Sequence, residues 1–174
     1  MKHFLFVLLV SVSLFAGNYE KGFEAYDKGN YKTAIKLWKF EAKQGNSAAQ
    51  YNLGLMYKNG QGVKQNYKEV AKWYRLAAKQ GYPEAQYNLG LMYTNGQGVK
   101  KDYKEAVKWF ELAAKQGKIL AQYNLGVMYY KGLGIKQDKI KAYQWWLKAA
   151  KQGYPKAQNA LDMLCKESPW ACKQ

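Results

Sequence analysis

The chain has 174 residues, a mass of 20.0 kDa and a formal net charge of +16, from 28 basic and 12 acidic residues. Arg75 is its only arginine, His3 its only histidine, and Cys165 and Cys172 are its two cysteines. These counts exclude sites that need two histidines or a cysteine-rich zinc cluster. An aromatic content of 16% also excludes a disordered basic tail.

The first residues have the pattern of a secretory signal peptide. A short basic start, residues 1–3, precedes an almost wholly apolar stretch, residues 4–15, and the small residues Ala16 and Gly17 follow. The apolar stretch is too short to span a bilayer. We therefore predict a cleaved signal peptide over residues 1–17, no stable membrane anchor after its removal, and a periplasmic or secreted bacterial protein. Cleavage would leave the mature chain without a histidine.

The rest of the chain repeats with a period of 36 residues. AQYNLGLMYKNGQGVK from Ala49 recurs with one difference from Ala85, and AQYNLGVMYYKGLGIK follows from Ala121. Each unit continues with a second motif, such as YKEAVKWF from Tyr103, and closes on Lys-Gln-Gly. The repeat region, 18–174, divides into units at about 18–45, 46–81, 82–117 and 118–153, with a C-terminal capping segment at 154–174.

The local chemistry predicts two helices in each unit. Pro83 and Pro155 stand where a first helix would start, a position at which the missing N–H costs nothing. Gly90 lies inside a predicted first helix, which indicates a close approach by another helix. The Asn-Gly-Gln-Gly segment then turns the chain.

The second helices carry signals at both ends. Asn66, Asp102 and Asp138 stand at the N-cap position. Glu69 and Glu105, three residues later, predict capping boxes, and the glycine of Lys-Gln-Gly stops each helix. Two such short helices cannot bury their apolar faces alone. We therefore expect an all-α fold, an α-solenoid in which antiparallel helix pairs stack into a right-handed superhelix.

These motifs resemble the Sel1-like repeat, a relative of the tetratricopeptide repeat. The shared pattern is A-x-x-x-L-G-x-x-Y-x-x-G-x-G-V, then A-x-x-W, then A-A-x-Q-G. In one unit it corresponds to Ala85, Leu89, Gly90, Tyr93, Gly96, Gly98, Val99, Ala106, Trp109, Ala113, Ala114, Gln116 and Gly117. The resemblance implies an exported scaffold for protein assemblies. It also implies an alternative, penicillin binding with weak β-lactam hydrolysis, which is associated with an exported cysteine-rich bacterial group whose repeats nearly all carry a cysteine pair.

The resemblance to tetratricopeptide arrays also implies a ligand surface. This surface is a concave groove, lined by the face of each first helix that does not pack against other helices. Asparagine can hold the backbone amides of a peptide, and tyrosine offers apolar contact with a polar tip. We therefore predict that the groove binds an extended peptide or an envelope protein. Packing of some of these tyrosines between units stays open as the alternative. The groove residues are Tyr51, Asn52, Leu55, Tyr87, Asn88, Leu91, Tyr123, Asn124 and Val127.

Other chemistry finds little support in the sequence. Ser47 and Ser168 lack the lysine three residues on that serine β-lactamases require, and a mature chain without histidine has no Ser-His-Asp triad. The paired glycines lack the third glycine and the preceding strand of a dinucleotide site. We expect no catalytic residue, no metal and no cofactor.

The cysteines and the lysines complete the expectations. Cys165 and Cys172 are separated by six residues, and in an exported protein we expect them to form a structural disulfide. Lys104, Lys108 and Lys115 recur along a second helix, which is typical of a solvated outer face. Nucleic-acid binders favour arginine, so we expect no nucleic-acid partner, and loose attraction to anionic envelope surfaces stays open.

Overall fold

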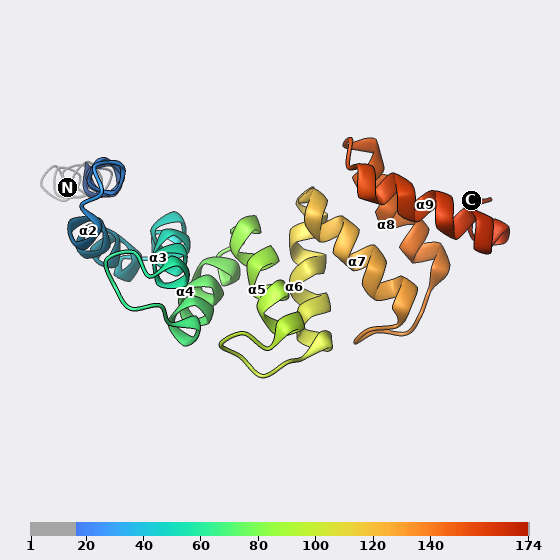
Figure 1. The fold of residues 1–174 in the computed structure, drawn as a ribbon, viewed down its shortest axis with the longest axis horizontal. Helices are drawn as coiled ribbons and strands as arrows, with labels where there is room; N and C mark the ends of the chain where they lie inside the picture. Colours follow the sequence, from blue (N-terminus) through green and yellow to red (C-terminus); the bar gives the residue numbers. More distant parts are fainter. Residues whose placement is uncertain (1–16, 174) are drawn as a thin grey trace, which may run out of the picture. The chain divides into compact units, whose positions relative to one another are not determined.

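The computed structural model describes residues 17–173, which form helices and turns without any strand (Figure 1). The predicted signal peptide, apart from Gly17, lies outside these residues. Residues 17–27 are helical. The elements that follow are α2 (Tyr31–Lys43), α3 (Ser47–Asn59), α4 (Tyr67–Lys79), α5 (Pro83–Asn95), α6 (Tyr103–Lys115), α7 (Ile119–Lys131), α8 (Lys139–Lys151), α9 (Pro155–Glu167) and the 3₁₀ helix η1 (Pro169–Cys172). The predicted all-α fold is confirmed.

The helices belong to two compact units that divide after Gln80. In the first unit α2 packs on α3 and α3 on α4, and in the second unit each helix from α5 to α9 packs on the next. The helices α3, α5, α7 and α9 begin 36 residues apart, at Ser47, Pro83, Ile119 and Pro155. The period of the sequence is therefore the period of an α-solenoid of stacked helix pairs.

The predicted caps form at the starts of the second helices. The side chains of Asn66, Asp102 and Asp138 each accept hydrogen bonds from backbone N–H groups two or three residues on. These bonds satisfy donors that the first turn of a helix leaves unpaired.

The predicted capping boxes are not completed. The backbone N–H of Asp102 donates to the Tyr93 carbonyl at 2.9 Å, so the donor that a box would satisfy is already used by the turn. Glu105 forms an ion pair with Lys108 instead, and Glu69 likewise pairs with a lysine of its own helix. The Glu105 carboxylate therefore has no free backbone N–H at the N-cap residue to accept from.

The glycine inside each first helix lies against an aromatic ring of the following helix, as predicted for Gly90. A Cβ atom at Gly90 would lie 2.6 Å from Cε1 of Phe110, closer than atoms can approach. The same contact recurs in the other repeats with tryptophan or tyrosine, as Gly22 with Trp38, Gly54 with Tyr74 and Gly126 with Trp146. The absent side chain therefore sets the distance between the two helices of a pair.

The second glycine of two Gly-x-Gly turns, one in each compact unit, contacts the preceding second helix. Gly134 has a φ of 69°, and a Cβ there would lie 2.3 Å from the Tyr103 carbonyl carbon in the first turn of α6. Gly62 makes the equivalent contact with Tyr31 at the start of α2. Positive φ and close backbone approach both require glycine here, so the paired glycines are structural.

A buried glutamine in the first helices joins three helices at one end of a repeat. Gln122 of α7 is 4% exposed, and its Nε2 donates to the Ala114 carbonyl at 3.2 Å. Its Oε1 accepts from Gln152 Nε2 at 2.8 Å, and Gln152 also donates to the Gly117 carbonyl. We call this set of bonds the glutamine relay. The first unit has the same relay through Gln50, which donates to a carbonyl of α2 and accepts from the glutamine after α4.

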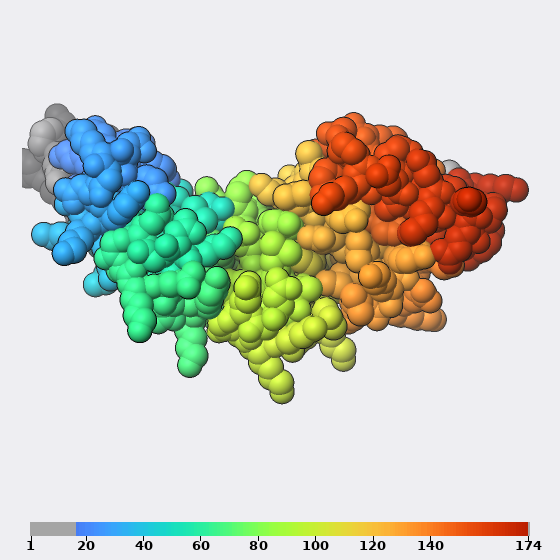
Figure 2. Space-filling model, viewed as in Figure 1, coloured from blue at the N-terminus to red at the C-terminus, as the bar shows by residue number. Residues whose placement is uncertain are grey.

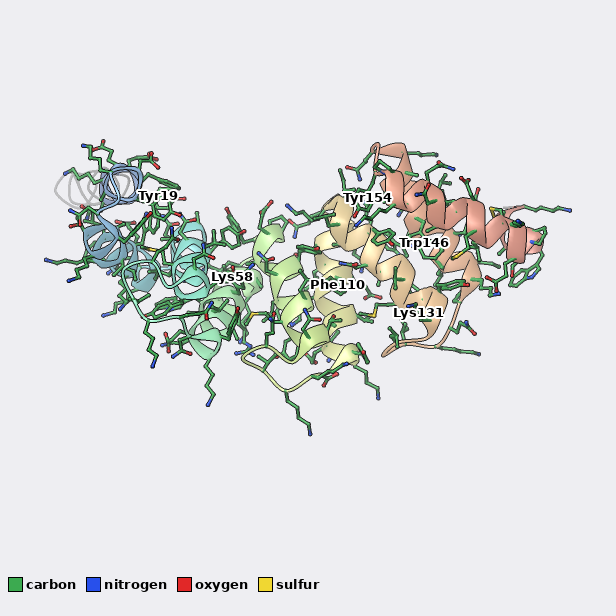
Figure 3. All side chains as sticks on the ribbon, in the orientation of Figure 1. Tyr19, Lys58, Phe110, Lys131, Trp146 and Tyr154 are labelled. Atoms are coloured by element: carbon green, nitrogen blue, oxygen red, sulfur yellow. A yellow bond between two sulfur atoms is a disulfide. The ribbon has the colours of Figure 1, made fainter. Side chains whose placement is uncertain are left out.

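The lysines predicted on the outer face of α6 lie outside. Lys104, Lys108 and Lys115 are all exposed. Figure 2 shows long side chains projecting from the surface, and in Figure 3 many projecting sticks end in nitrogen.

One acidic side chain is buried in the first unit. Glu41 of α2 is only 2% exposed, and its Oε1 has no hydrogen-bond partner among the described residues. Burial raises the pKa of Glu41 above its ordinary value, and a hydrogen bond with Asn46 offsets part of this effect.

Replacing Glu41 by glutamine should stabilise the protein at neutral pH. Because the pKa of Glu41 is higher in the folded state, that state binds more protons between the unfolded and folded pKa values, and stability falls as pH rises through this window. Glu41→Gln should therefore raise the melting temperature at neutral pH and remove this part of the pH dependence. Thermal unfolding followed by circular dichroism measures both, with Glu24→Gln on the exposed surface as the control. A lower melting temperature for Glu41→Gln at neutral pH would contradict the argument.

Candidate functional site

The nine predicted groove residues form three sets of three, one each on α3, α5 and α7, and all nine are half-buried. We call these sets the first-helix faces. The α3 face belongs to the first compact unit, and the α5 and α7 faces belong to the second.

The tyrosine of each first-helix face packs over the aromatic ring that fills the glycine contact of its own repeat. Tyr51 stacks on Tyr74 with the ring centroids 5.4 Å apart. Tyr87 lies over Phe110 at 5.9 Å, and Tyr123 lies 6.5 Å from the Trp146 ring. Part of each tyrosine therefore serves packing within its repeat.

Two of the asparagines, Asn52 and Asn124, make hydrogen bonds to tyrosines of the preceding first helix. Asn52 Nδ2 donates to the Tyr19 hydroxyl at 3.4 Å. In the second unit, burial raises the pKa of Tyr87 and a hydrogen bond with the Asn124 side chain partly offsets this. Such a bond uses one of the two amide donors, so an asparagine that makes it still has an acceptor oxygen and a second donor.

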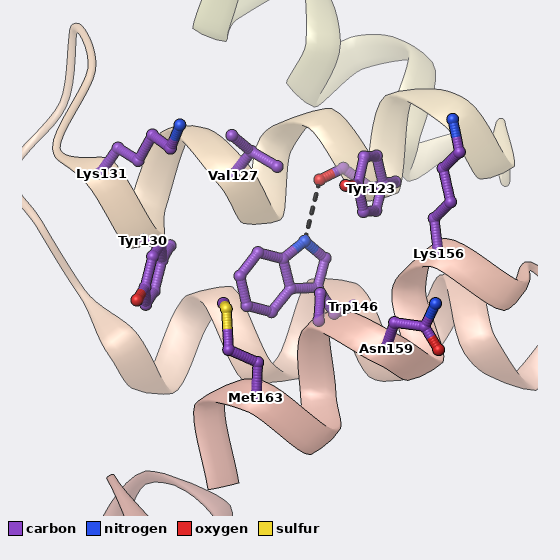
Figure 4. A pocket seen from close by; sticks show the side chains of 9 residues that line it. Tyr123, Val127, Tyr130, Lys131, Trp146, Lys156, Asn159 and Met163 are labelled. Atoms are coloured by element: carbon purple, nitrogen blue, oxygen red, sulfur yellow. Dashed lines mark hydrogen bonds between the residues drawn. The ribbon is translucent and has the colours of Figure 1, made fainter. Parts of the chain in front are cut away.

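A pocket with a volume of about 470 Å³ lies where α7, α8 and α9 meet (Figure 4). Trp146 lies at its centre, and the indole Nε1 donates to the Tyr123 carbonyl at 3.1 Å. We call it the end pocket. Four of its residues come from α7, one from α8 and four from α9: Tyr123, Val127, Tyr130, Lys131, Trp146, Lys156, Asn159, Ala160 and Met163.

Only Tyr123 and Val127 of the end pocket were predicted as ligand contacts. Trp146 and Met163 keep the aromatic and apolar character of their repeat positions. The other five escape a search for repeated residues because they depart from the repeat: Tyr130, Lys131, Lys156, Asn159 and Ala160. Asn159 and Ala160 stand at the repeat positions of Tyr123 and Asn124, so α9 offers less bulk and leaves space over Trp146. The signal in the sequence was the change of residue type in the last unit.

The two cysteines have a structural role. Cys165 of α9 and Cys172 of η1 form the predicted disulfide, with their Cα atoms 5.6 Å apart. Over residues 17–173, no group of three histidine, cysteine or carboxylate side chains is placed to hold a metal ion.

Comparison with known families agrees with the repeat geometry. The Sel1 repeat model matches residues 47–82, 83–118 and 119–154. The chain belongs to the Sel1 repeat family. A search of the curated proteins finds no match.

Solved structures of other Sel1 repeat proteins are similar to this one. A Sel1 repeat protein from Oxalobacter formigenes is 37% identical, with a TM-score of 0.80 over 84% of this chain and 62% of its own. A protective antigen present in uropathogenic Escherichia coli strains is 40% identical, with a TM-score of 0.83 over 88% of this chain and 34% of its own. This Sel1 repeat chain thus spans less than two thirds of either relative.

The fold is also shared with cysteine-rich protein B of Helicobacter pylori. That protein is 20% identical, with a TM-score of 0.59, and the match covers 75% of this chain and 96% of that one. At this level of identity the comparison supports a shared Sel1 fold and nothing further.

Proposed function

We propose that this Sel1 repeat protein is an exported scaffold that binds an extended peptide, or an exposed segment of an envelope protein, on its first-helix faces. The supporting observation is the half-buried pair of tyrosine and asparagine that each face presents. An asparagine that bonds a tyrosine hydroxyl is held in place, while its remaining donor and acceptor can meet a peptide group. Held side chains lose less entropy on binding than free ones.

The disulfide supports the exported location. The Cys165–Cys172 disulfide favours an oxidising compartment. None of the helices in the described part of the chain is long and apolar enough to cross a membrane. Together with the signal-peptide pattern of residues 1–17, the disulfide fits a periplasmic or secreted protein.

The test removes the peptide-binding donors and keeps the bonds to tyrosine. In the triple variant Asn52→Asp, Asn88→Asp and Asn124→Asp, each carboxylate can still accept a hydrogen bond from a tyrosine hydroxyl, but it cannot donate to a peptide carbonyl. Peptides selected from a random display library on the wild-type protein should bind this variant at least about tenfold more weakly by fluorescence polarisation.

The matched control carries the same change of charge on exposed positions. It combines Asn59→Asp, Asn95→Asp and Gln97→Glu, at exposed positions at or just beyond the ends of α3 and α5. Binding should be retained in the control, and melting temperatures should be similar in both variants. Equal affinity of the selected peptides for the wild type and the triple asparagine variant would reject the first-helix faces as the binding surface.

A further inference from the structure

We propose that the end pocket binds a peptide segment that has an apolar or aromatic residue between two acidic residues. The inference rests on the proposed peptide-binding function and assigns the chemistry of the segment taken by the last repeat. The occupant follows from the size of the pocket, its apolar floor, and the cations at its two ends.

The pocket suits one large apolar side chain. Its volume of about 470 Å³ falls in the range of sites that enclose small ligands. Val127, Trp146 and Met163 present apolar surface to it (Figure 4). Met163 is 47% exposed, so covering it would bury apolar area that the protein alone leaves in water.

Two lysines lie at opposite ends of this apolar floor. Lys131 stands at the end of α7 and Lys156 in the first turn of α9, and Figure 4 shows them on opposite sides of Trp146. Both side chains are exposed, and no ion pair of either is found among residues 17–173.

The lysines have no basic counterparts in the earlier units, Lys131 belonging to the unit at 118–153 and Lys156 to the C-terminal capping segment. The earlier repeat equivalents of Lys131 are asparagines, and those of Lys156 are Ala48, Glu84 and Leu120. Neither position is basic in an earlier repeat, so the common lysine pattern of the chain does not account for them.

The carboxylate that bonds a pocket residue does not cancel this positive charge. Glu167 accepts a hydrogen bond from the hydroxyl of Tyr130, a pocket residue, at 2.6 Å. It is also paired with Lys139 at 2.7 Å. With Glu167 offset by Lys139, the two end lysines leave the pocket attractive to anions.

The spacing of the lysines indicates the length of the segment. Lys131 lies eleven residues after Leu120, the repeat equivalent of Lys156. At about 1.5 Å per helical residue the two backbone positions are roughly 16 Å apart along the helix direction. An extended peptide advances about 3.3 Å per residue, and lysine side chains can lean inward. Acidic residues about three to five positions apart therefore fit.

A capped, fluorescein-labelled peptide provides the probe. It has one phenylalanine, a glutamate two residues to either side, and serine elsewhere, and fluorescence polarisation measures its affinity for the mature protein. Lys131→Gln with Lys156→Gln should weaken binding by about five- to tenfold. Met163→Ala, at an exposed side chain, should weaken it by about threefold.

The control pair separates the pocket from the general positive charge. Lys104→Gln with Lys115→Gln removes two exposed charges on α6, and affinity should change by less than about twofold. Peptides with glutamine in place of glutamate, or serine in place of phenylalanine, should bind more weakly than the probe. Equal weakening by the two lysine pairs, no binding by the wild type, or undiminished binding of the glutamine peptide would overturn the proposal.

The outcomes also distinguish this proposal from the proposed function. If the triple asparagine variant loses the library-selected peptides while the Lys131 and Lys156 changes leave probe binding intact, the end-pocket proposal alone fails. If the lysine changes weaken probe binding and the asparagine changes leave the affinity of the selected peptides unchanged, the first-helix faces are rejected as the binding surface and the end-pocket proposal is supported.

Discussion

Alanine in place of Gly126 should destabilise the protein by about 2 to 3 kcal/mol, although alanine is the better helix former. The new methyl carbon would lie 2.4 Å from Cδ1 and Nε1 of Trp146. The ring cannot simply rotate away, because Trp146 is 2% exposed and its Nε1 is bonded to the Tyr123 carbonyl. The clash can therefore be relieved only if α7 and α8 move apart or if the hydrogen bond from Trp146 Nε1 to the Tyr123 carbonyl breaks. Chemical denaturation followed by circular dichroism measures the loss.

A double-mutant cycle tests the cause. Trp146→Ala alone should cost about 3 to 5 kcal/mol, as for other large buried side chains. When Gly126→Ala is combined with it, the added methyl group enters the space that the indole leaves, so the combined loss should be clearly smaller than the sum. Additive losses of stability would show that the contact between Gly126 and Trp146 does not cause the destabilisation by Gly126→Ala.

Leucine in place of Gln122 should cost about 2 kcal/mol. The side chain of Gln122 is buried, and the substitution keeps its approximate volume while it removes two hydrogen bonds. One is to the Ala114 carbonyl at the end of α6, which still accepts from the backbone N–H of Gly117. Gln152 also loses an acceptor, but it is exposed and retains the Gly117 carbonyl. The loss should therefore come from the two hydrogen bonds of Gln122, at about 1 kcal/mol each.

The cycle with Gln152 and a surface control test this assignment. Adding Gln152→Leu to Gln122→Leu should cost less than Gln152→Leu does alone, because their mutual bond is already lost. Gln97→Leu, on an exposed turn, should stay within about 0.5 kcal/mol of the wild type. If Gln122→Leu unfolds at the same denaturant concentration as the wild type, the relay does not stabilise the fold.

Much of the fold was predictable because local chemistry repeats. Pro83 fixes a helix start, Asp102 a cap, and Gly90 a close contact, and each signal acts within a few residues of itself. The relay was missed because a glutamine followed by Tyr-Asn gives no sign of burial. Gln122 is buried only because residues eight before it and thirty after it present partners.

The candidate site was less predictable because it, too, depends on contacts between residues that are far apart in the sequence. Tyr123 could be placed on a first-helix face from the period alone. Its packing against Trp146 and Tyr154 depends on rings from α8 and from the turn before α9, which the period does not place. The end pocket depends on substitutions in α9 opposite α7, so it becomes visible only when the two helices are brought together.

The glutamine relay has a consequence for how arrays of this kind change length. Each relay glutamine finds its partners a fixed number of residues away, eight back and thirty forward, in both compact units. Gain or loss of a whole 36-residue module would give every remaining glutamine an equivalent partner, whereas an insertion inside a helix would shift one of the partners away. The near-identical segments that begin at Ala49 and Ala85 are natural sites for unequal recombination. The gene can thus lengthen or shorten the array in whole repeats while the last repeat, with its own pocket, stays at the end.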